Sequence, residues 1–184
     1  MKAITLWQPW ASLIACGAKK YETRSWSTSY RGPIAIHAAA VTPSTTLRHI
    51  FPLGAWSYHP DYSAKCAFMK DVYQAIFPEK VAQGEGFEYL DKMDSLPRGA
   101  IIATAELVEC WEIQPSNGRG VNYKDVFIHK RDLQGLDGFT WIEGNERLFG
   151  DWTPGRYAWE LQNVVMLPEP IPAKGAQGLW NWEG

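Results

Sequence analysis

Cysteine is scarce in this chain of 184 residues, which contains only Cys16, Cys66 and Cys110. An odd number of widely separated thiols is not typical of a disulfide framework, so we expect reduced cysteines and a cytoplasmic protein. Long hydrophobic runs are also missing, because no apolar segment approaches the roughly 18–20 residues that cross a membrane. The opening residues, MKAITLWQPW, do not resemble a signal peptide. We therefore expect no membrane partner.

Neither sign of charge is in large excess. The 18 Lys and Arg residues and the 20 Asp and Glu residues give a formal net charge of −2. A protein that binds duplex nucleic acid through its phosphates usually has a strong basic excess, because phosphate neutralisation supplies the affinity. The composition therefore argues against a duplex-binding surface and is compatible only with a local basic patch.

Several short motifs that carry chemistry are absent. The sequence has no GxxxxGK[ST] phosphate-binding loop, no GxSxG nucleophile motif and no CxxC pair. Its four histidines, His37, His49, His59 and His129, are far apart, which argues against a zinc site. We therefore expect neither a metal nor a cofactor.

The spacing of apolar residues predicts a mainly β protein. The expected strands are at residues 2–7, 33–39, 99–113 and 155–167. The expected helical regions are a short helix at residues 9–17 that ends at Gly17 and two helices within residues 41–97. Residues 114–150 read as a polar, Gly-rich excursion with one short helix.

This order of elements favours an α+β fold. A small, mostly antiparallel β-barrel with flanking helices accommodates strands in the outer parts of the chain and helices in between. A length of 184 residues fits one domain with elaborations. We expect a single domain over residues 1–184, with insertions at about 41–97 and 113–147.

The chain contains ten tryptophans, and a short charged segment lies between two of them, Trp10 and Trp26. GAKKYETR, residues 17–24, has the spacing G-x-K-x-x-E-x-R. A structural interpretation is that Lys19 and Lys20 complement a helix C-terminus while Glu22 and Arg24 pair along a strand. Residue spacing alone favours this interpretation.

The same stretch resembles the signature of ASCH domains, which belong to the PUA-like superfamily of RNA-associated small barrels. The segments LWQPWASLI, YRGPIAIHA, GAIIATAELVEC and FGDWTPGRYAWEL resemble the family's flanking elements. The likeness covers residues 1–40, 98–112 and 148–183. It implies a barrel whose motif lines a cleft for a base or nucleotide, and association with nucleic acid. One branch of the family removes an acyl group from N4 of acylated cytidine nucleosides.

The residue types fit a nucleobase site. Lys19 and Arg24 are donors for phosphate or carbonyl oxygens, and the Glu22 carboxylate can accept from an exocyclic amine. Trp10 or Trp26 can stack on a base, with Trp26 favoured because its sequence neighbours are polar. The candidate ligand-binding residues are Gln8, Trp10, Lys19, Glu22, Arg24, Trp26 and Trp159, of which Gln8 would read a base edge and Trp159 is more typical of a core.

Three functions follow from these residues. We favour a module that binds single-stranded RNA, another single-stranded nucleic acid, or a nucleoside or nucleotide. The alternative is an amidohydrolase in which Lys19 and Glu22 are catalytic. Lysine chemistry needs a neutral amine, and Glu22, which stands where that branch has threonine, favours the ammonium. In a site without water in which Arg24 neutralises Glu22, the carboxylate would no longer favour the ammonium form of Lys19. A protein-interaction module with a protein partner, docking through GLWNWE near the C-terminus, is the third function. For Trp180 and Trp182 we favour the alternative that they close the barrel.

Overall fold

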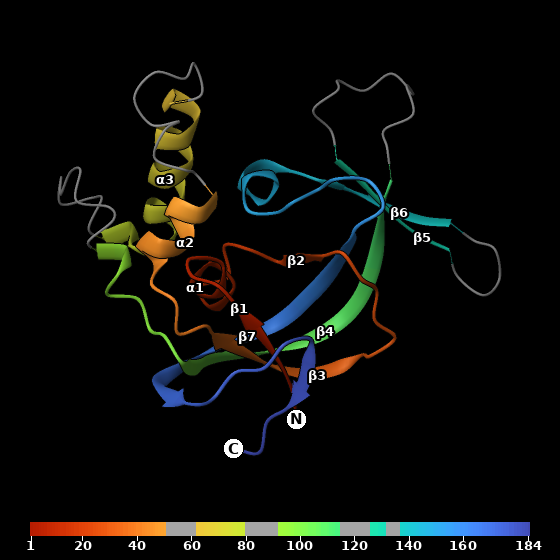
Figure 1. Ribbon diagram of the computed structural model, residues 1–184. Coiled ribbons are helices and arrows are strands. Elements are labelled where there is room, and N and C mark those ends of the chain that lie inside the picture. The colour runs from red at the N-terminus through yellow and green to blue at the C-terminus, as the bar shows by residue number, and fades with distance from the viewer. Residues whose placement is uncertain (51–61, 80–91, 115–125, 132–136) are drawn as a thin grey trace. The chain divides into compact units, whose positions relative to one another are not determined.

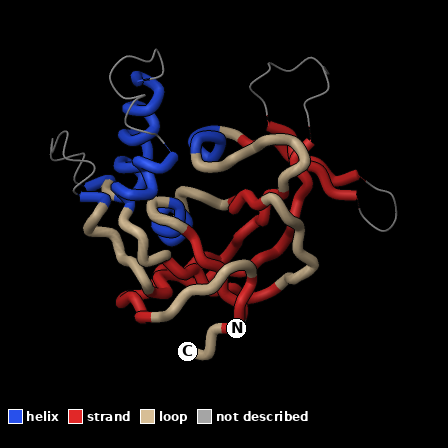
Figure 2. Tube along the Cα trace, in the orientation of Figure 1, coloured by secondary structure: helices blue, strands red, loops and turns tan. Residues whose placement is uncertain are grey.

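The computed structural model describes residues 1–50, 62–79, 92–114, 126–131 and 137–184. Strands make up most of the regular structure, and the helices are few (Figures 1 and 2). The elements in chain order are β1 (Lys2–Leu6), α1 (Trp10–Ala15), β2 (Tyr21–Arg24), β3 (Gly32–Ala38), α2 (Pro43–Ile50), α3 (Tyr62–Ile76), β4 (Ala100–Gln114), β5 (Val126–Arg131), β6 (Asp137–Ile142), the 3-10 helix η2 (Gly144–Leu148), β7 (Tyr157–Pro172) and β8 (Leu179–Asn181).

These elements confirm the α+β, mainly β class, with both parallel and antiparallel strand pairs. Closure into a barrel stays a prediction. Contacts group the chain into two compact units, which we describe separately. The first unit comprises Met1–Ala18, Ile34–Thr104 and Val164–Gly184, and the second comprises Lys19–Pro33 and Ala105–Asn163. The single domain and its two insertions stay predictions.

The sheet of the first unit is built around β1. It pairs in parallel with β3 and antiparallel with β8, so that Ile4 lies between Ile36 and Leu179. The strand β4 follows β3 in the hydrogen-bonded order, and β7 follows β4. Apolar side chains of alternate residues pack on one face because successive residues of a strand point to opposite faces. This core cluster comprises Ala3, Ala35 and Ile101, with Leu167, Ala173, Trp180 and Trp182 packed against it.

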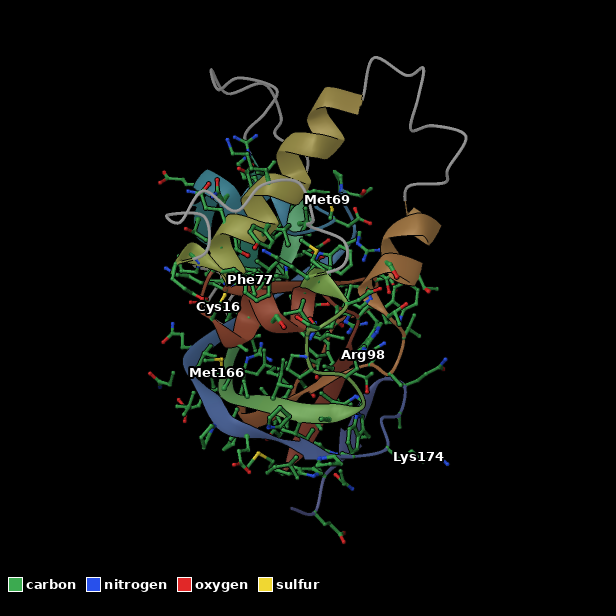
Figure 3. All side chains as sticks on the ribbon, turned by 90° about the vertical axis from the view of Figure 1, so that its left-hand side faces the viewer. Cys16, Met69, Phe77, Arg98, Met166 and Lys174 are labelled. Carbon is green, nitrogen blue, oxygen red and sulfur yellow. The ribbon has the colours of Figure 1, made fainter. Side chains whose placement is uncertain are left out.

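Helix α1 is shorter than the predicted helix at residues 9–17. The Gln8 side chain stabilises the first turn of α1, because its Oε1 accepts a hydrogen bond of 3.1 Å from the Ser12 amide. Its end is marked by Gly17, which has φ of +79° and whose amide donates to the Ile14 carbonyl oxygen. The Cys16 Sγ lies 3.7 Å from the Ala75 carbonyl oxygen, so the end of α1 meets the end of α3 (Figure 3).

The second unit contains a β-hairpin that the sequence analysis missed. Strands β5 and β6 are antiparallel, and β5 also pairs with β4. The prediction for residues 114–150 was therefore wrong in part: η2 supplies the expected short helix, but two strands stand where a polar excursion was expected. Apolar residues of both strands contribute to the core of this unit, since Ile128 and Ile142 are buried in one cluster with Ile113 and Ala158.

Strand β7 extends beyond the predicted end at residue 167 and contributes to both units. Its last part is solvent-exposed, and the Met166 side chain is 62% exposed (Figure 3). Among the described helices, none is both long and apolar enough to span a membrane.

Candidate functional site

The pairing of β2 with β7 in the second unit places the charged motif. In this antiparallel pair, Glu22 lies opposite Trp159 and Arg24 lies opposite Tyr157. Residues two apart on a strand share a face, so Glu22 and Arg24 point to the same side of the sheet. Tyr21 and Thr23 point to the other side. The charged side chains of Glu22 and Arg24 therefore lie on one face of β2, and those of Tyr21 and Thr23 lie on the other.

The side chains of Lys19, Glu22 and Arg24 form one contiguous cluster. The Lys19 Nζ donates a hydrogen bond to the Tyr21 carbonyl oxygen and lies 3.9 Å from the Glu22 Oε2. The other carboxylate oxygen, Glu22 Oε1, lies 3.2 Å from the Arg24 Nε. The structure thus places the Glu22 carboxylate between an ammonium group and a guanidinium group.

Burial differs sharply across this cluster. The side chain of Lys19 is 1% exposed, that of Glu22 is 12% exposed and that of Arg24 is 27% exposed. A molecule arriving from solvent therefore meets Arg24 and the edge of Glu22 first. Lys19 is the buried member of the ion pair with Glu22.

Burial also sets the protonation of Lys19. Loss of hydration lowers the pKa of the Lys19 ammonium, against the opposing effects of the Glu22 and Glu146 carboxylates, and Arg24 lowers that pKa further. From the sequence we expect Glu22 to favour the ammonium form of Lys19 unless the site is dry and Arg24 neutralises Glu22. In the structure desolvation is the largest influence on the pKa of Lys19 and acts against Glu22, while Arg24 pairs with Glu22. That Glu22 keeps Lys19 protonated stays a prediction.

Two tryptophans complete this part of the second unit. Trp159 is fully buried, and its ring meets the Trp26 ring edge-on, with 4.5 Å between the ring centroids. The Trp159 Nε1 also donates to the Trp26 carbonyl oxygen at 3.3 Å. Trp26 itself is 36% exposed. The arrangement gives Trp159 a supporting position and leaves part of Trp26 accessible.

The opposite face of β2 carries an aromatic group. The Tyr21 ring meets the Trp152 ring edge-on at 6.2 Å, and both pack against the Ile113 cluster. Burial, with the Glu160 and Glu146 carboxylates, raises the pKa of Tyr21 to about 12. Tyr21 therefore stays neutral at physiological pH and anchors β2 to the core.

Glu146, which lies on η2, was not predicted as a site residue from the sequence. Its carboxylate accepts hydrogen bonds from the backbone amides of Lys20 and Tyr21, at 2.7 Å and 3.1 Å. No periodicity or short motif links residue 146 to residue 20. The only signal in the sequence was an acidic residue shortly before the FGDW segment, which does not specify a partner.

Gln8 and Trp10 belong to the first unit. Gln8 is fully buried, and its Nε2 donates to the Pro97 carbonyl oxygen at 2.8 Å. Both ends of its side-chain amide thus bond to backbone groups. Trp10 is half-buried at the start of α1. Their contact with a ligand stays a prediction. Within the described ranges, no three His, Cys, Asp or Glu side chains are grouped so that they could hold a metal ion.

Comparison with known proteins identifies one family. The sequence model of the ASCH domain matches residues 4–133, which is more than half of the chain and includes the whole GAKKYETR stretch. No curated protein matches the chain. The matched region begins within β1, includes the elements up to β5 and ends before η2 and β7, which supply Glu146 and Trp159.

Proposed function

The chain belongs to the ASCH domain family, and on that premise we propose that Glu22, Arg24 and Trp26 recognise a nucleobase in single-stranded RNA or in a free nucleotide. One observation carries the proposal. The Glu22 carboxylate is held between Lys19 and Arg24, at 3.9 Å and 3.2 Å, and Glu22 lies opposite Trp159, whose ring contacts the partly exposed Trp26. An anion and an aromatic ring in the same strand pair suit a flat ligand with an amino group.

Glu22 supplies the selectivity in this proposal. A carboxylate accepts a hydrogen bond from the exocyclic amine of cytosine, whereas the carbonyl at the same position of uracil offers no donor. The Lys19 Nζ and the Arg24 Nε lie on either side of the carboxylate and limit its orientations. Glu22 therefore favours bases that carry an amino group over bases that carry a carbonyl there.

Arg24 and Trp26 supply affinity. The Arg24 guanidinium is the most exposed charge of the cluster and has a planar array of donors that suits a carbonyl or phosphate oxygen. Stacking of a base on an aromatic side chain contributes roughly 1–3 kcal/mol. A base of a single strand can reach such a ring, while a paired base cannot without leaving its helix.

Fluorescence titration with short single strands and with duplexes of the same sequence tests this function. We expect tighter binding of the single strands, since a net charge of −2 provides little general attraction for a duplex. Equal or tighter binding of the duplexes contradicts the proposal. Titrations at two salt concentrations separate base recognition from phosphate attraction.

Hydrolysis of N4-acylated cytidine is the second candidate function, and the burial of Lys19 favours it. A lowered pKa increases the fraction of neutral amine, which is the form that can act as a base or a nucleophile. The reaction breaks the bond between the acyl carbon and N4, adding hydroxyl from water to the carbon and a proton to the nitrogen. Lys19 would act on this bond beside Glu22.

Chromatography of N4-acetylcytidine incubated with the protein separates the two functions. Turnover that is lost in Lys19→Met and kept in Lys20→Met, the matched control at the neighbouring exposed lysine, would support the hydrolase. Binding of cytidine nucleotides without turnover would support recognition alone.

A further inference from the structure

We propose that Glu146 is a positioning residue whose carboxylate fixes the start of β2 and thereby holds Lys19 beneath Glu22. The inference rests on the proposed function for the ligand-binding role of the cluster. Its structural basis is separate. The Glu146 Oε2 accepts from the Lys20 amide at 2.7 Å, and the Glu146 Oε1 accepts from the Tyr21 amide at 3.1 Å.

The two hydrogen bonds constrain the backbone next to Lys19. Both oxygens of one carboxylate engage two successive amides, which fixes the orientation of that peptide segment as well as its distance. On the other side, the Lys20 carbonyl oxygen accepts from the Leu161 amide of β7 at 2.8 Å. The Lys20 amide thus bonds to η2 and the Lys20 carbonyl oxygen bonds to β7. These two bonds fix the backbone next to Lys19 and so limit the directions in which the Lys19 side chain can point.

The short helix that carries Glu146 is itself anchored. Phe149 directly follows η2 and is buried, and its amide donates to the Glu146 carbonyl oxygen at 3.1 Å. Trp152 adds a second tie, because its Nε1 donates to the Arg147 carbonyl oxygen at 3.1 Å. The backbone that carries Glu146 is therefore anchored, and its side chain extends from there to the start of β2.

The charge of Glu146 has a second effect on the cluster. A nearby anion favours the ammonium form of lysine, and Glu146 raises the pKa of Lys19 against the dominant effect of burial. Glu146 and Glu22 together keep Lys19 charged over a wider pH range than burial alone would allow. In this proposal a charged Lys19 holds the Glu22 carboxylate in place for a base.

Glu146→Gln tests the inference, with Glu143→Gln as the matched control at an exposed residue just before η2. The amide side chain of glutamine has the same shape, but it presents one donor where a second acceptor is needed and carries no charge. NMR titration of the Lys19 side chain reports its pKa without any ligand. We expect this pKa to fall in Glu146→Gln and to stay unchanged in Glu143→Gln.

Binding of cytidine monophosphate provides the second readout. We expect Glu146→Gln to weaken it about tenfold at neutral pH. Deprotonation of Lys19 should weaken binding at alkaline pH, and this loss should begin at a lower pH in Glu146→Gln. Glu146→Asp, which restores the charge, should recover part of both effects, and it also serves as the test if Glu146→Gln does not fold.

The outcomes are distinct. An unchanged Lys19 pKa in Glu146→Gln, or tighter nucleotide binding, would overturn the positioning role. Tighter binding would mean that Glu146 competes with the ligand for the two amides. A lowered Lys19 pKa in a protein that binds no nucleotide in either form would support the positioning role and refute the proposed function.

Discussion

Glu22 lies directly opposite Trp159 across β2 and β7, so a carboxylate stands next to a fully buried indole. The register of the two strands alone produces this pair. A shift of the register by one residue would place Tyr21 or Thr23 opposite Trp159 instead of Glu22. Neighbouring residues of a strand face opposite sides, so the charged side chains would then lie on the other face. The same indole donates to the Trp26 backbone carbonyl oxygen and contacts the Trp26 ring, so Trp159 adjoins both Glu22 and Trp26.

Replacement of Trp26 tests the stacking role. We expect Trp26→Ala to weaken binding of a single-stranded oligonucleotide by about 1–3 kcal/mol, the contribution of one stacked base. The control is Trp7→Ala, at another exposed tryptophan that the proposal does not use. Fluorescence titration compares the two variants. Equal losses in both would show that Trp26 has no special role.

Replacement of Arg24 tests the electrostatics of the cluster. Arg24 lowers the pKa of Lys19, and it also pairs with the carboxylate that would otherwise stabilise the ammonium. Arg24→Met should therefore raise the pKa of Lys19, opposite to the effect expected for Glu146→Gln. NMR titration of Lys19 in both variants checks the signs. A fall of the pKa in Arg24→Met would contradict the described arrangement.

His37 makes the stability of the first unit depend on pH. The His37 Nε2 hydrogen-bonds to the Ala173 carbonyl oxygen at 3.0 Å, and among the described residues its Nδ1 has no hydrogen-bond partner. Burial lowers the pKa of His37 below its usual 6.5, although the bond to Ala173 opposes the shift. Protonation would add a buried donor without an acceptor, so the folded state resists it.

The sign follows from this lowered pKa. The contribution of neutral His37 is fully present above pH 6.5 and is lost as the pH falls toward the pKa of the folded state. We expect the free energy of unfolding to fall by at most about 1.4 kcal/mol per pH unit through this one group. Urea unfolding between pH 7.5 and 5, compared with His37→Gln, isolates the effect. Identical slopes in both proteins would contradict it.

Gly175 provides a steric test of the same region. A Cβ at this position would lie 2.6 Å from the His37 Nδ1 and 2.8 Å from the Thr5 Oγ1. Gly175→Ala should therefore destabilise the protein by about 1–3 kcal/mol, as overpacking does. Thermal unfolding measures the loss. In a His37→Ala background the cost should shrink, because the ring is gone. An undiminished cost would show that the His37 ring is not the obstacle.

Local patterns predicted most of the elements. The strand-like segment at residues 2–7, bounded by a turn, and the apolar run at residues 33–39 reflect strands whose side chains fill a core, and β1 and β3 lie there. Gly17 ends its helix because few other residues adopt its backbone conformation at low cost. The charged residues of GAKKYETR were found from their spacing, and the family match covers them.

Interactions between distant segments could not be predicted in this way. The hairpin of β5 and β6 looked polar and Gly-rich, and its buried residues Ile128 and Ile142 form a core only when β4 and β7 are present. The protonation of Lys19 depends on burial by the whole unit, which a pair of neighbouring charges does not reveal. Glu146 reaches Lys20 across 126 residues, a contact that only the fold creates.

Nucleotide selectivity in the protein and in Glu22→Gln tests the central claim most directly. Isothermal titration with cytidine monophosphate and uridine monophosphate measures both affinities under the same conditions. The account predicts that the protein prefers cytidine monophosphate, and that Glu22→Gln loses this preference because an amide both donates and accepts. Equal affinity of the protein for the two nucleotides, or a preference that survives Glu22→Gln, would contradict it.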